Sequence, residues 1–293
     1  EEVFGMGGNS DRATVAAPAT APPKLQTMAT YDAAADRYDD DVLSFWSLHG
    51  ERTVDRLGLR PGDVVLDVCC GTGASALPAA KRVGPGGRVI GVDLSEGMLA
   101  RARAKAQAGR LRNLVFRAGD MEQLGLPPAS FDAVVCAFGI FFATDMVGQV
   151  AELWRMVRPG GRLAVTTWGE GAFEPAAALF WDIVRGERPD LYRGFNPWDR
   201  IVRPDAVLTL LLDGGARGVE AEAVRASMAV RSVEDFWTLA LGTGLRAIVE
   251  QLGPGATRVR ETFLSEIAAR RIDRFDVSAV FATATKPAGA SGP

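Results

Sequence analysis

Short apolar runs rich in β-branched residues alternate with helical segments through the middle of the chain. The runs lie at 64–70, 88–94, 113–120, 131–140 and 162–168, and helical periodicity marks 74–83, 95–108 and 145–157. Strands without a polar face must be covered on both sides, so these runs indicate parallel strands with helices on both faces of one sheet. The predicted fold class is therefore α/β, with a Rossmann-like sheet.

The chain before the first strand divides into two parts. Residues 1–28 are rich in Gly, Ala and Pro and follow neither a helical nor a strand period, which predicts a flexible leader. Apolar residues recur at three- and four-residue steps over 29–60, which predicts an N-terminal helical cap. We expect one domain over 29–293 that begins with this cap.

The chain after the fifth run changes pattern. Segments 169–203 and 230–270 mix Gly, Pro, aromatic and helical stretches, and we expect them to be inserted as a lid. Strand patterns at 218–230 and 274–286 are joined through helices. Two further strands would bring the sheet to seven.

Composition narrows the chemistry by exclusion. The 293 residues include one His and three Cys, and the formal net charge is −3. A single His and the lack of a Cys-x-x-Cys pair exclude the usual zinc sites, so no metal site is predicted. A net negative charge argues against nucleic acid as a partner, because phosphates attract basic surfaces.

Other sequence features bear on the cellular compartment of the protein. No apolar run approaches the roughly 18 residues that a membrane-spanning helix needs. The first residues lack the basic start and apolar stretch of a secretory signal. Cys69 and Cys70 are adjacent and Cys136 is distant, a spacing that suits reduced thiols. These features predict a cytoplasmic protein without a membrane span.

A Gly-rich loop and an acid at a strand end form the first functional motif. The loop GTGASA follows the first strand, where Gly71 and Gly73 permit a tight turn and a close approach of the backbone to a ligand. Asp93 ends the second strand, where a carboxylate accepts hydrogen bonds from both ribose hydroxyls. Together they indicate a cofactor that contains adenosine.

Two further acids distinguish among such cofactors. A carboxylate at Asp67, four residues before Gly71, would repel the pyrophosphate of a dinucleotide but favour the ammonium and sulfonium of S-adenosylmethionine. Asp120 ends the third strand, where it can accept from the adenine amino group, with the Met121 N–H near a ring nitrogen. No Tyr is followed by Lys four residues later, and no GK[ST] phosphate loop exists. The residues therefore favour S-adenosylmethionine over a nicotinamide or flavin.

The motifs VLDVCCGTG, VIGVDLSEGML, AGDMEQL and LWRMVRPGGRLAVTTW resemble, in order and spacing, those of class I S-adenosylmethionine-dependent methyltransferases. In particular they look like the ubiquinone/menaquinone C-methyltransferase-like group, or methyltransferase type 11. The resemblance covers 64–168, and 31–53 is similar to the first helix of that group. It implies a seven-stranded, mostly parallel sheet whose last strand, at 274–286, is antiparallel.

The resemblance also implies where the cofactor lies. Residues at the strand ends would surround its methionine, ribose and adenine parts in turn. The residues implied are Asp67, Cys70, Gly71 and Gly73 for methionine, Asp93 for ribose, Leu94, Met98, Asp120 and Met121 for adenine, and Ala137 and Phe138 for the sulfonium side. Tyr31 and Tyr38 lie two helical turns apart and either cap the cofactor or pack in the core.

The acceptor region is aromatic. The aromatic residues are Phe138, Phe141 and Phe142 after the fourth strand, and Phe173, Phe180, Trp181, Phe195 and Trp198 in the first insertion. They predict a pocket for a small, largely apolar metabolite, such as a quinone, a polyketide or a prenyl compound, which is methylated at carbon or oxygen.

Two other functions stay open at this point. The first insertion contains five arginines, Arg185, Arg188, Arg193, Arg200 and Arg203, which are either surface charges or a clamp for an anion. As a clamp they would suit an allylic-diphosphate (prenyl diphosphate) C-methyltransferase with Mg²⁺. A homologue that binds the cofactor without turnover is the second alternative.

Two residues are candidates for a catalytic base. Glu170 follows the fifth strand at the sheet edge where acceptors bind, so it could take a proton during C-methylation. His49, near the end of the first helix, resembles the position of a His in quinone methyltransferases. A solvent-exposed acid and a helix-end residue without chemistry are the respective alternatives. The acceptor itself and formation of a homo-oligomer stay open.

Overall fold

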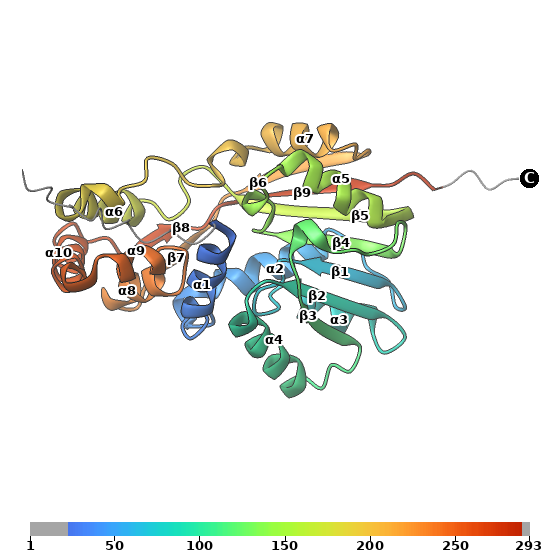
Figure 1. Cartoon of the computed structure of the whole chain (residues 1–293), viewed down its shortest axis with the longest axis horizontal. Helices are drawn as coiled ribbons and strands as arrows, with labels where there is room; N and C mark the ends of the chain where they lie inside the picture. The colour runs from blue at the N-terminus through green and yellow to red at the C-terminus, as the bar shows by residue number, and fades with distance from the viewer. Residues whose placement is uncertain (1–22, 289–293) are drawn as a thin grey trace, which may run out of the picture.

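The computed structural model describes residues 23–288, and a seven-stranded sheet forms its centre (Figure 1). In order across the sheet, the strands are β3 (Leu114–Ala118), β2 (Arg88–Asp93), β1 (Val64–Val68), β4 (Phe131–Ala137), β5 (Val157–Trp168), β9 (Ala279–Thr285) and β6 (Val219–Val224). Strand β9 runs antiparallel to its neighbours β5 and β6, and the other pairs in this sheet are parallel. The predicted Rossmann-like, mostly parallel sheet with an antiparallel last strand is confirmed.

Alternate side chains of the central strands pack against helices on opposite faces of this sheet. The flanking helices are α2 (Phe45–Asp55), α3 (Ala76–Val83), α4 (Glu96–Ala108), α5 (Met146–Met156) and α7 (Pro204–Asp213). Val65 and Val135 lie in an apolar cluster with α2, α3 and α4. Leu66 and Val134, one position away, lie in the cluster with α5 and α7. Because successive strand residues point to opposite faces, strands that are buried on both faces are continuous apolar runs.

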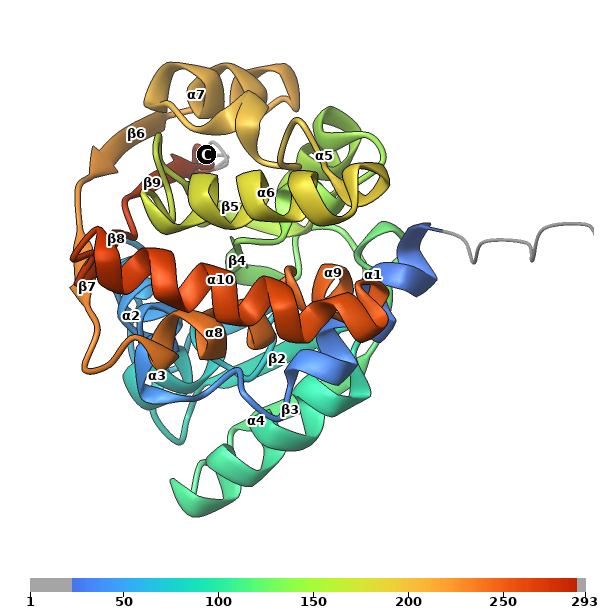
Figure 2. The same cartoon turned by 90° about the vertical axis from the view of Figure 1, so that its left-hand side faces the viewer.

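A second group of helices gathers beyond the carboxyl ends of the strands, on the left in Figure 1 and towards the viewer in Figure 2. Its elements are α6 (Ala176–Glu187), α8 (Glu234–Leu241), α9 (Arg246–Gln251), α10 (Ala256–Ala269) and the small sheet of β7 (Ser227–Ala229) with β8 (Arg274–Asp276). Segments 169–203 and 230–270 supply these helices, and their action as a lid stays a prediction. Within the described residues, no helix has the length and apolar character needed to cross a membrane.

The N-terminal segment departs from the expected pattern. Helix α1 (Pro23–Ala34) begins inside the segment 1–28 for which the sequence predicts a leader, and residues 1–22 lie outside the described part of the chain. Turns and a short 3-10 helix, η1 (Asp41–Leu43), separate α1 from α2. The aspartates of this stretch, Asp39 to Asp41, favour turns because their side chains compete for backbone hydrogen bonds. The cap pattern therefore contains two helices.

The strand patterns at 218–230 and 274–286 are each broken into two strands. Ser278 lies at the break, where its N–H and hydroxyl donate to the Asp276 carboxylate at 2.7 and 2.9 Å. The Ala226 N–H donates to the Ser278 hydroxyl at 3.1 Å. These side-chain bonds replace ladder bonds, so both segments leave the main sheet together and pair as β7 and β8.

A substitution at Gly50 can test how closely α2 packs on the Gly-rich loop. A Cβ at this buried position would lie 2.3 Å from the Ala74 carbonyl oxygen, whereas a Cβ at Gly86 would meet nothing within 4 Å. We expect Gly50→Ala to lower the free energy of unfolding by about 1–3 kcal/mol through overpacking, and Gly86→Ala to change it by less than about 0.5 kcal/mol. Urea unfolding measures both. Equal stabilities would contradict the close approach.

Candidate active site

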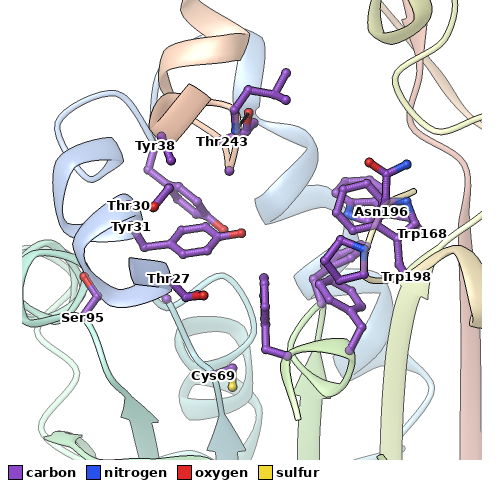
Figure 3. Close-up of a pocket in the computed structure, with 18 of the residues that line it drawn as sticks. Thr27, Thr30, Tyr31, Tyr38, Cys69, Ser95, Trp168, Asn196, Trp198 and Thr243 are labelled. Carbon is purple, nitrogen blue, oxygen red and sulfur yellow. Dashed lines mark hydrogen bonds between the residues drawn. The ribbon is translucent and has the colours of Figure 1, made fainter. Parts of the chain in front are cut away.

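A cavity of about 1010 Å³ lies between the carboxyl ends of the strands and the second group of helices (Figure 3). Loops after β1, β2 and β3 form one wall, and α6, α8, α9 and the segment before α7 form the other. Pockets for one ligand span roughly 300–1,000 Å³, so this cavity has room for two small molecules side by side. The carboxyl edge of the sheet is also where open α/β sheets bind ligands.

The two glycines of the loop 69–75 have different surroundings. Gly71 lines the cavity with φ 52°, and a Cβ there would come within 3.9 Å of the Tyr38 ring. The Tyr38 ring therefore lies directly over Gly71, whose positive φ favours glycine. Gly73, with φ 89°, does not line the cavity, and a Cβ there would lie 3.2 Å from Leu77. Gly73 therefore serves the turn into α3, and Gly71 faces the ligand space.

Asp67 lies beneath this loop and does not line the cavity. The residue is 1% exposed, and its Oδ2 accepts from the Ser75 hydroxyl at 2.7 Å. Its Oδ1 has no hydrogen-bond partner within residues 23–288. Burial raises the pKa of Asp67 to about 7. A buried oxygen without a donor favours a nearby donor or positive charge, so Asp67 presents an unmet acceptor below the loop.

Asp93 joins the loops after β1 and β2. Its Oδ2 accepts from the Gly71 N–H at 2.8 Å, and its Oδ1 accepts from the Ser95 N–H at 2.9 Å. The carboxylate lines the cavity beside Leu94 and Met98, and burial raises the pKa of Asp93. Its remaining lone pairs are available to hydroxyl donors of a ligand.

Asp120 already has a cationic partner. Its Oδ2 accepts from Lys24 Nζ at 2.8 Å, and its Oδ1 accepts from the Glu122 N–H at 2.9 Å. Lys24 also forms an ion pair with Glu122. An adenine amino group at Asp120 would have to share this carboxylate with Lys24, which the sequence assigned to a leader.

Tyr31 and Tyr38 enter the cavity from the N-terminal segment, opposite Trp168 and Trp198 (Figure 3). The Tyr38 ring stacks on Trp46 with centroids 4.9 Å apart, and Tyr31 meets Phe142 edge-on at 5.7 Å. Burial raises the pKa of both phenols, so at neutral pH their hydroxyls are neutral donors.

Most residues expected at the cofactor do converge on this cavity. Those that line it are Tyr31, Tyr38, Cys70, Gly71, Asp93, Leu94, Met98, Asp120, Met121, Ala137 and Phe138. Asp67 and Gly73 do not line it, and neither do the two candidate bases, His49 and Glu170.

His49 is a core residue, contrary to the expectation of a base at the acceptor. It is 0% exposed, and its Nε2–H donates to the Val277 carbonyl at 2.8 Å. The ring packs against Phe138 and Phe281 with centroids 5.6 and 5.7 Å apart. Burial lowers the pKa of His49 to about 4, so the ring is neutral at neutral pH. The periodicity of α2 turns this side chain towards the sheet, where it lies behind the cavity-lining rings of Phe138 and Trp168.

Glu170 also departs from its expected position. It is exposed in the turn after β5, next to Gly171 with φ 77°, and it does not line the cavity. The turn directs the chain away from the ligand space before it re-enters at Phe173 and Glu174, which do line it. A strand-end position therefore did not suffice to place Glu170 at an acceptor.

Aromatic rings form the part of the cavity away from Asp93. Phe138 and Trp168 have ring centroids 4.2 Å apart, and Trp168 contacts Phe173 at 4.6 Å. Trp198 contacts Phe141 at 5.5 Å. The aromatic lining also includes Trp46, Phe142, Phe180, Trp181, Phe195, Phe236 and Phe263. We call this part the aromatic chamber, and its residues come from α2, from the sheet edge and from both insertions.

The arginines of the first insertion do not form an anion clamp. Arg185 pairs with Asp182 at 2.6 Å, Arg188 with Asp190 at 2.7 Å and Arg203 with Asp205 at 3.2 Å, all at exposed positions. Of the five, Arg193 lines the cavity. The allylic-diphosphate alternative is therefore not supported.

Several polar residues of the lining were missed by sequence reasoning. Figure 3 shows Thr27 and Thr30 on α1, Ser95 after β2 and Thr243 between α8 and α9. Thr27 lies one helical turn before Tyr31, so a predicted helix that began before residue 29 would have included it on the same face. Thr243 carries no local signal, because long-range packing brings α8 to the cavity.

Comparisons with known proteins agree with these observations. A family model described as a methyltransferase domain matches residues 65–161. The chain is 35% identical over 187 residues to aklanonic acid methyltransferase DauC of Streptomyces sp. (strain C5), across 60% of this chain and 85% of that protein. It is 38% identical over 154 residues to demethylmenaquinone methyltransferase of Beutenbergia cavernae, across 51% of this chain and 61% of that relative's length.

Among solved structures, the [4+2]-cyclase SpnF is similar with a TM-score of 0.57 and 20% identity, covering 92% of this chain and 98% of that one. At this identity the likeness shows the fold alone, and one fold can support different reactions. The match to DauC shows the family, because it covers 85% of that protein at 35% identity. The chain belongs to the class I S-adenosylmethionine-dependent methyltransferases, in the group that includes the ubiquinone and menaquinone C-methyltransferases.

Proposed function

We propose that this methyltransferase transfers a methyl group to a carbon or oxygen of a flat, largely apolar aromatic metabolite of the quinone or polyketide kind. One observation supports this most directly: a single cavity joins the strand-end acids to the aromatic chamber. The names of the relatives, which act on aklanonic acid and demethylmenaquinone, point to the same class of acceptor. Aromatic walls favour flat rings because stacked or edge-on rings gain more than area burial alone.

We assign the cofactor to the polar end of this cavity. The residues there suit it, since Asp93 offers acceptors for ribose hydroxyls and the backbone of Gly71 lines the cavity beside it. In this proposal Asp120 and Met121 face the adenine, with Leu94 and Met98 against it. S-adenosylmethionine, when bound, supplies a methyl group that its sulfonium has already activated.

The protein's contribution to the transfer is alignment and exclusion of water. Trp168 and Trp198 hold the acceptor plane, and Tyr31 and Tyr38 offer neutral hydroxyls that donate to an acceptor oxygen. Holding two reactants in line accounts for a large share of such a rate enhancement. We assign no proton transfer to His49 or Glu170, since neither lines the cavity.

Methyl transfer can be tested directly with cofactor labelled in the methyl group. We would offer three acceptors separately: a demethylmenaquinol, an anthraquinone carboxylic acid, and geranyl diphosphate with Mg²⁺. Label in an aromatic acceptor is expected, and none in geranyl diphosphate. Transfer to geranyl diphosphate alone would overturn the proposed acceptor class, and binding of neither S-adenosylmethionine nor S-adenosylhomocysteine would overturn the cofactor assignment.

Asp93 should dominate cofactor affinity. We expect Asp93→Ala to weaken S-adenosylhomocysteine binding by about 1–3 kcal/mol, roughly 5- to 150-fold, because it removes a buried charged acceptor. Isothermal titration calorimetry measures the loss. Asp213→Ala, at the exposed end of α7, is the control and should bind like wild type. Unchanged affinity in Asp93→Ala would remove this residue from the site.

Trp198 should affect the acceptor and spare the cofactor. We expect Trp198→Leu to raise KM for the aromatic acceptor about tenfold through lost ring contacts, with S-adenosylhomocysteine affinity within about twofold of wild type. Trp237→Leu is a matched control, since Trp237 is half-buried on α8 outside the lining. Steady-state kinetics give the KM values. The same KM in both variants would exclude the aromatic chamber as the acceptor site.

His49 should govern stability against pH rather than turnover. Between pH 6.5 and about 4 the unfolded chain protonates His49 while the folded chain does not, so its contribution is complete above pH 6.5 and declines as the pH falls. At 1.36 kcal/mol per pKa unit, wild type should lose about 2 kcal/mol more than His49→Gln between pH 7.5 and 5. Asp67, whose raised pKa acts in the opposite direction, is present in both proteins and cancels.

Urea unfolding at the two pH values measures this difference, and methyl transfer at pH 7.5 is the companion assay. His49→Gln keeps an N–H donor for the Val277 carbonyl, so we expect turnover within a few-fold of wild type. The same pH dependence in both proteins would contradict the buried neutral ring. Loss of turnover with intact stability would restore His49 as a candidate base.

A further inference from the structure

The segment 23–40 crosses the three loops that we assign to the cofactor. Lys24 contacts Asp120 after β3, Asp32 contacts Ser95 after β2, and Asp39 contacts Thr72 after β1. The strands lie side by side in the order β3-β2-β1. The segment therefore runs across the carboxyl edge and meets one loop after another, and we call residues 23–40 the strap.

The contact in the middle of the strap holds α1 against the start of α4. Asp32 Oδ1 accepts from the Ser95 hydroxyl and from the Gly97 N–H at 3.0 Å. A Cβ at Gly97 would lie 3.1 Å from the Asp32 carboxylate and 3.3 Å from Ala35. The two helices thus approach as closely as a glycine allows, and Asp32 supplies an acceptor to the Gly97 N–H in the first turn of α4.

The contact at the end of the strap holds the Gly-rich loop. Asp39 Oδ1 accepts from the Thr72 hydroxyl at 2.8 Å and from Lys105 Nζ at 2.7 Å. Lys105 Nζ also donates to the Thr72 hydroxyl oxygen at 2.8 Å. Thr72 is 1% exposed and follows Gly71 directly. This closed triangle of three side chains ties the strap, the loop and α4 together.

Each of these aspartates follows a tyrosine that faces the cavity. Tyr31 precedes Asp32 and Tyr38 precedes Asp39, so each dipeptide directs its ring inward and its carboxylate onto a loop. The Tyr38 ring lies over Gly71, and Tyr31 lies between Phe142 and the turn at Gly244. The ring positions therefore depend on where the aspartates are fastened.

We propose that Asp32 and Asp39 are positioning residues that latch the strap over the bound cofactor. Tyr31 and Tyr38 then face the acceptor only while both latches are closed, and the cofactor product leaves only after the strap detaches. This inference rests on the proposed placement of the cofactor against Gly71 and Asp93. It assigns the rate of cofactor exchange to two carboxylates that need not touch the cofactor.

Release of S-adenosylhomocysteine from the full chain tests the latches. Excess S-adenosylmethionine displaces it in a stopped-flow instrument, with tryptophan fluorescence as the signal because Trp46 stacks on Tyr38. We expect Asp32→Ala and Asp39→Ala to release it about tenfold faster than wild type, in line with loss of a charged hydrogen bond. Asp40→Ala is the matched control, since Asp40 pairs with Arg37 within the same turn at 3.5 Å, and it should release at the wild-type rate.

Hydrogen exchange separates a latch from a general loss of structure. In wild type, S-adenosylhomocysteine should slow amide exchange over 23–40, and this slowing should disappear in Asp32→Ala and Asp39→Ala while exchange in the strands stays unchanged. Thr72→Val provides a second variant, which removes the hydroxyl but keeps the contact of Lys105 with Asp39, and it should also speed release. If Asp32→Ala or Asp39→Ala does not fold, Thr72→Val takes its place in the test.

The outcomes distinguish the two proposals. Wild-type protein that does not bind S-adenosylhomocysteine would overturn the proposed cofactor site. Wild-type binding with wild-type release rates in Asp32→Ala, Asp39→Ala and Thr72→Val would overturn the latch and leave the cofactor site intact. If Asp40→Ala released S-adenosylhomocysteine as fast as Asp32→Ala and Asp39→Ala, the latch would also be overturned, because faster release would then come from any change in this turn.

Discussion

The hydrogen bond from the Gly71 N–H to the Asp93 carboxylate is the interaction on which the rest of the site depends. It joins the loops after two neighbouring parallel strands, β1 and β2, at the edge where both end. Burial makes the Asp93 charge costly unless donors meet it, and the N–H groups of Gly71 and Ser95 do so. The same bond holds Gly71 in its left-handed conformation with its backbone open to the cavity.

The elements that line the cavity give it two chemical environments, one polar and one aromatic. The loops after β1, β2 and β3 present carboxylates and backbone, because the loops after buried strands are where polar groups can emerge. Aromatic rings come from the ends of β4 and β5, as Phe138 and Trp168 do, and from the insertions, which bury their apolar faces against each other, as Phe180 does on Phe263. One cavity therefore offers polar surroundings to a charged cofactor and aromatic surroundings to an apolar acceptor. The strap crosses the polar environment and contributes two rings to the boundary between them.

Strand ends and helix faces differ in how far the sequence determines where a side chain lies. Asp93, Asp120 and Phe138 line one cavity because parallel strands align their carboxyl ends, so a position at the end of a strand is also a position in space. His49 and Glu170 do not line this cavity, because the chemistry of a side chain does not indicate its direction. Helix α2 turns His49 towards Val277 in the core, and the turn at Gly171 carries Glu170 into solvent.

The sequence by itself determined the mostly parallel sheet, the cofactor class and the strand-end loops that line the cavity, because these depend on local periodicity and on motifs that are contiguous in the chain. Only the tertiary structure decided how the segment around Lys24 is used, which arginines are paired on the surface, and which rings enclose the acceptor. Those features rest on contacts between residues far apart in the chain, such as Lys24 with Asp120 and Asp39 with Thr72. Helix α1 has little apolar periodicity of its own, and its position comes from the loops that it crosses.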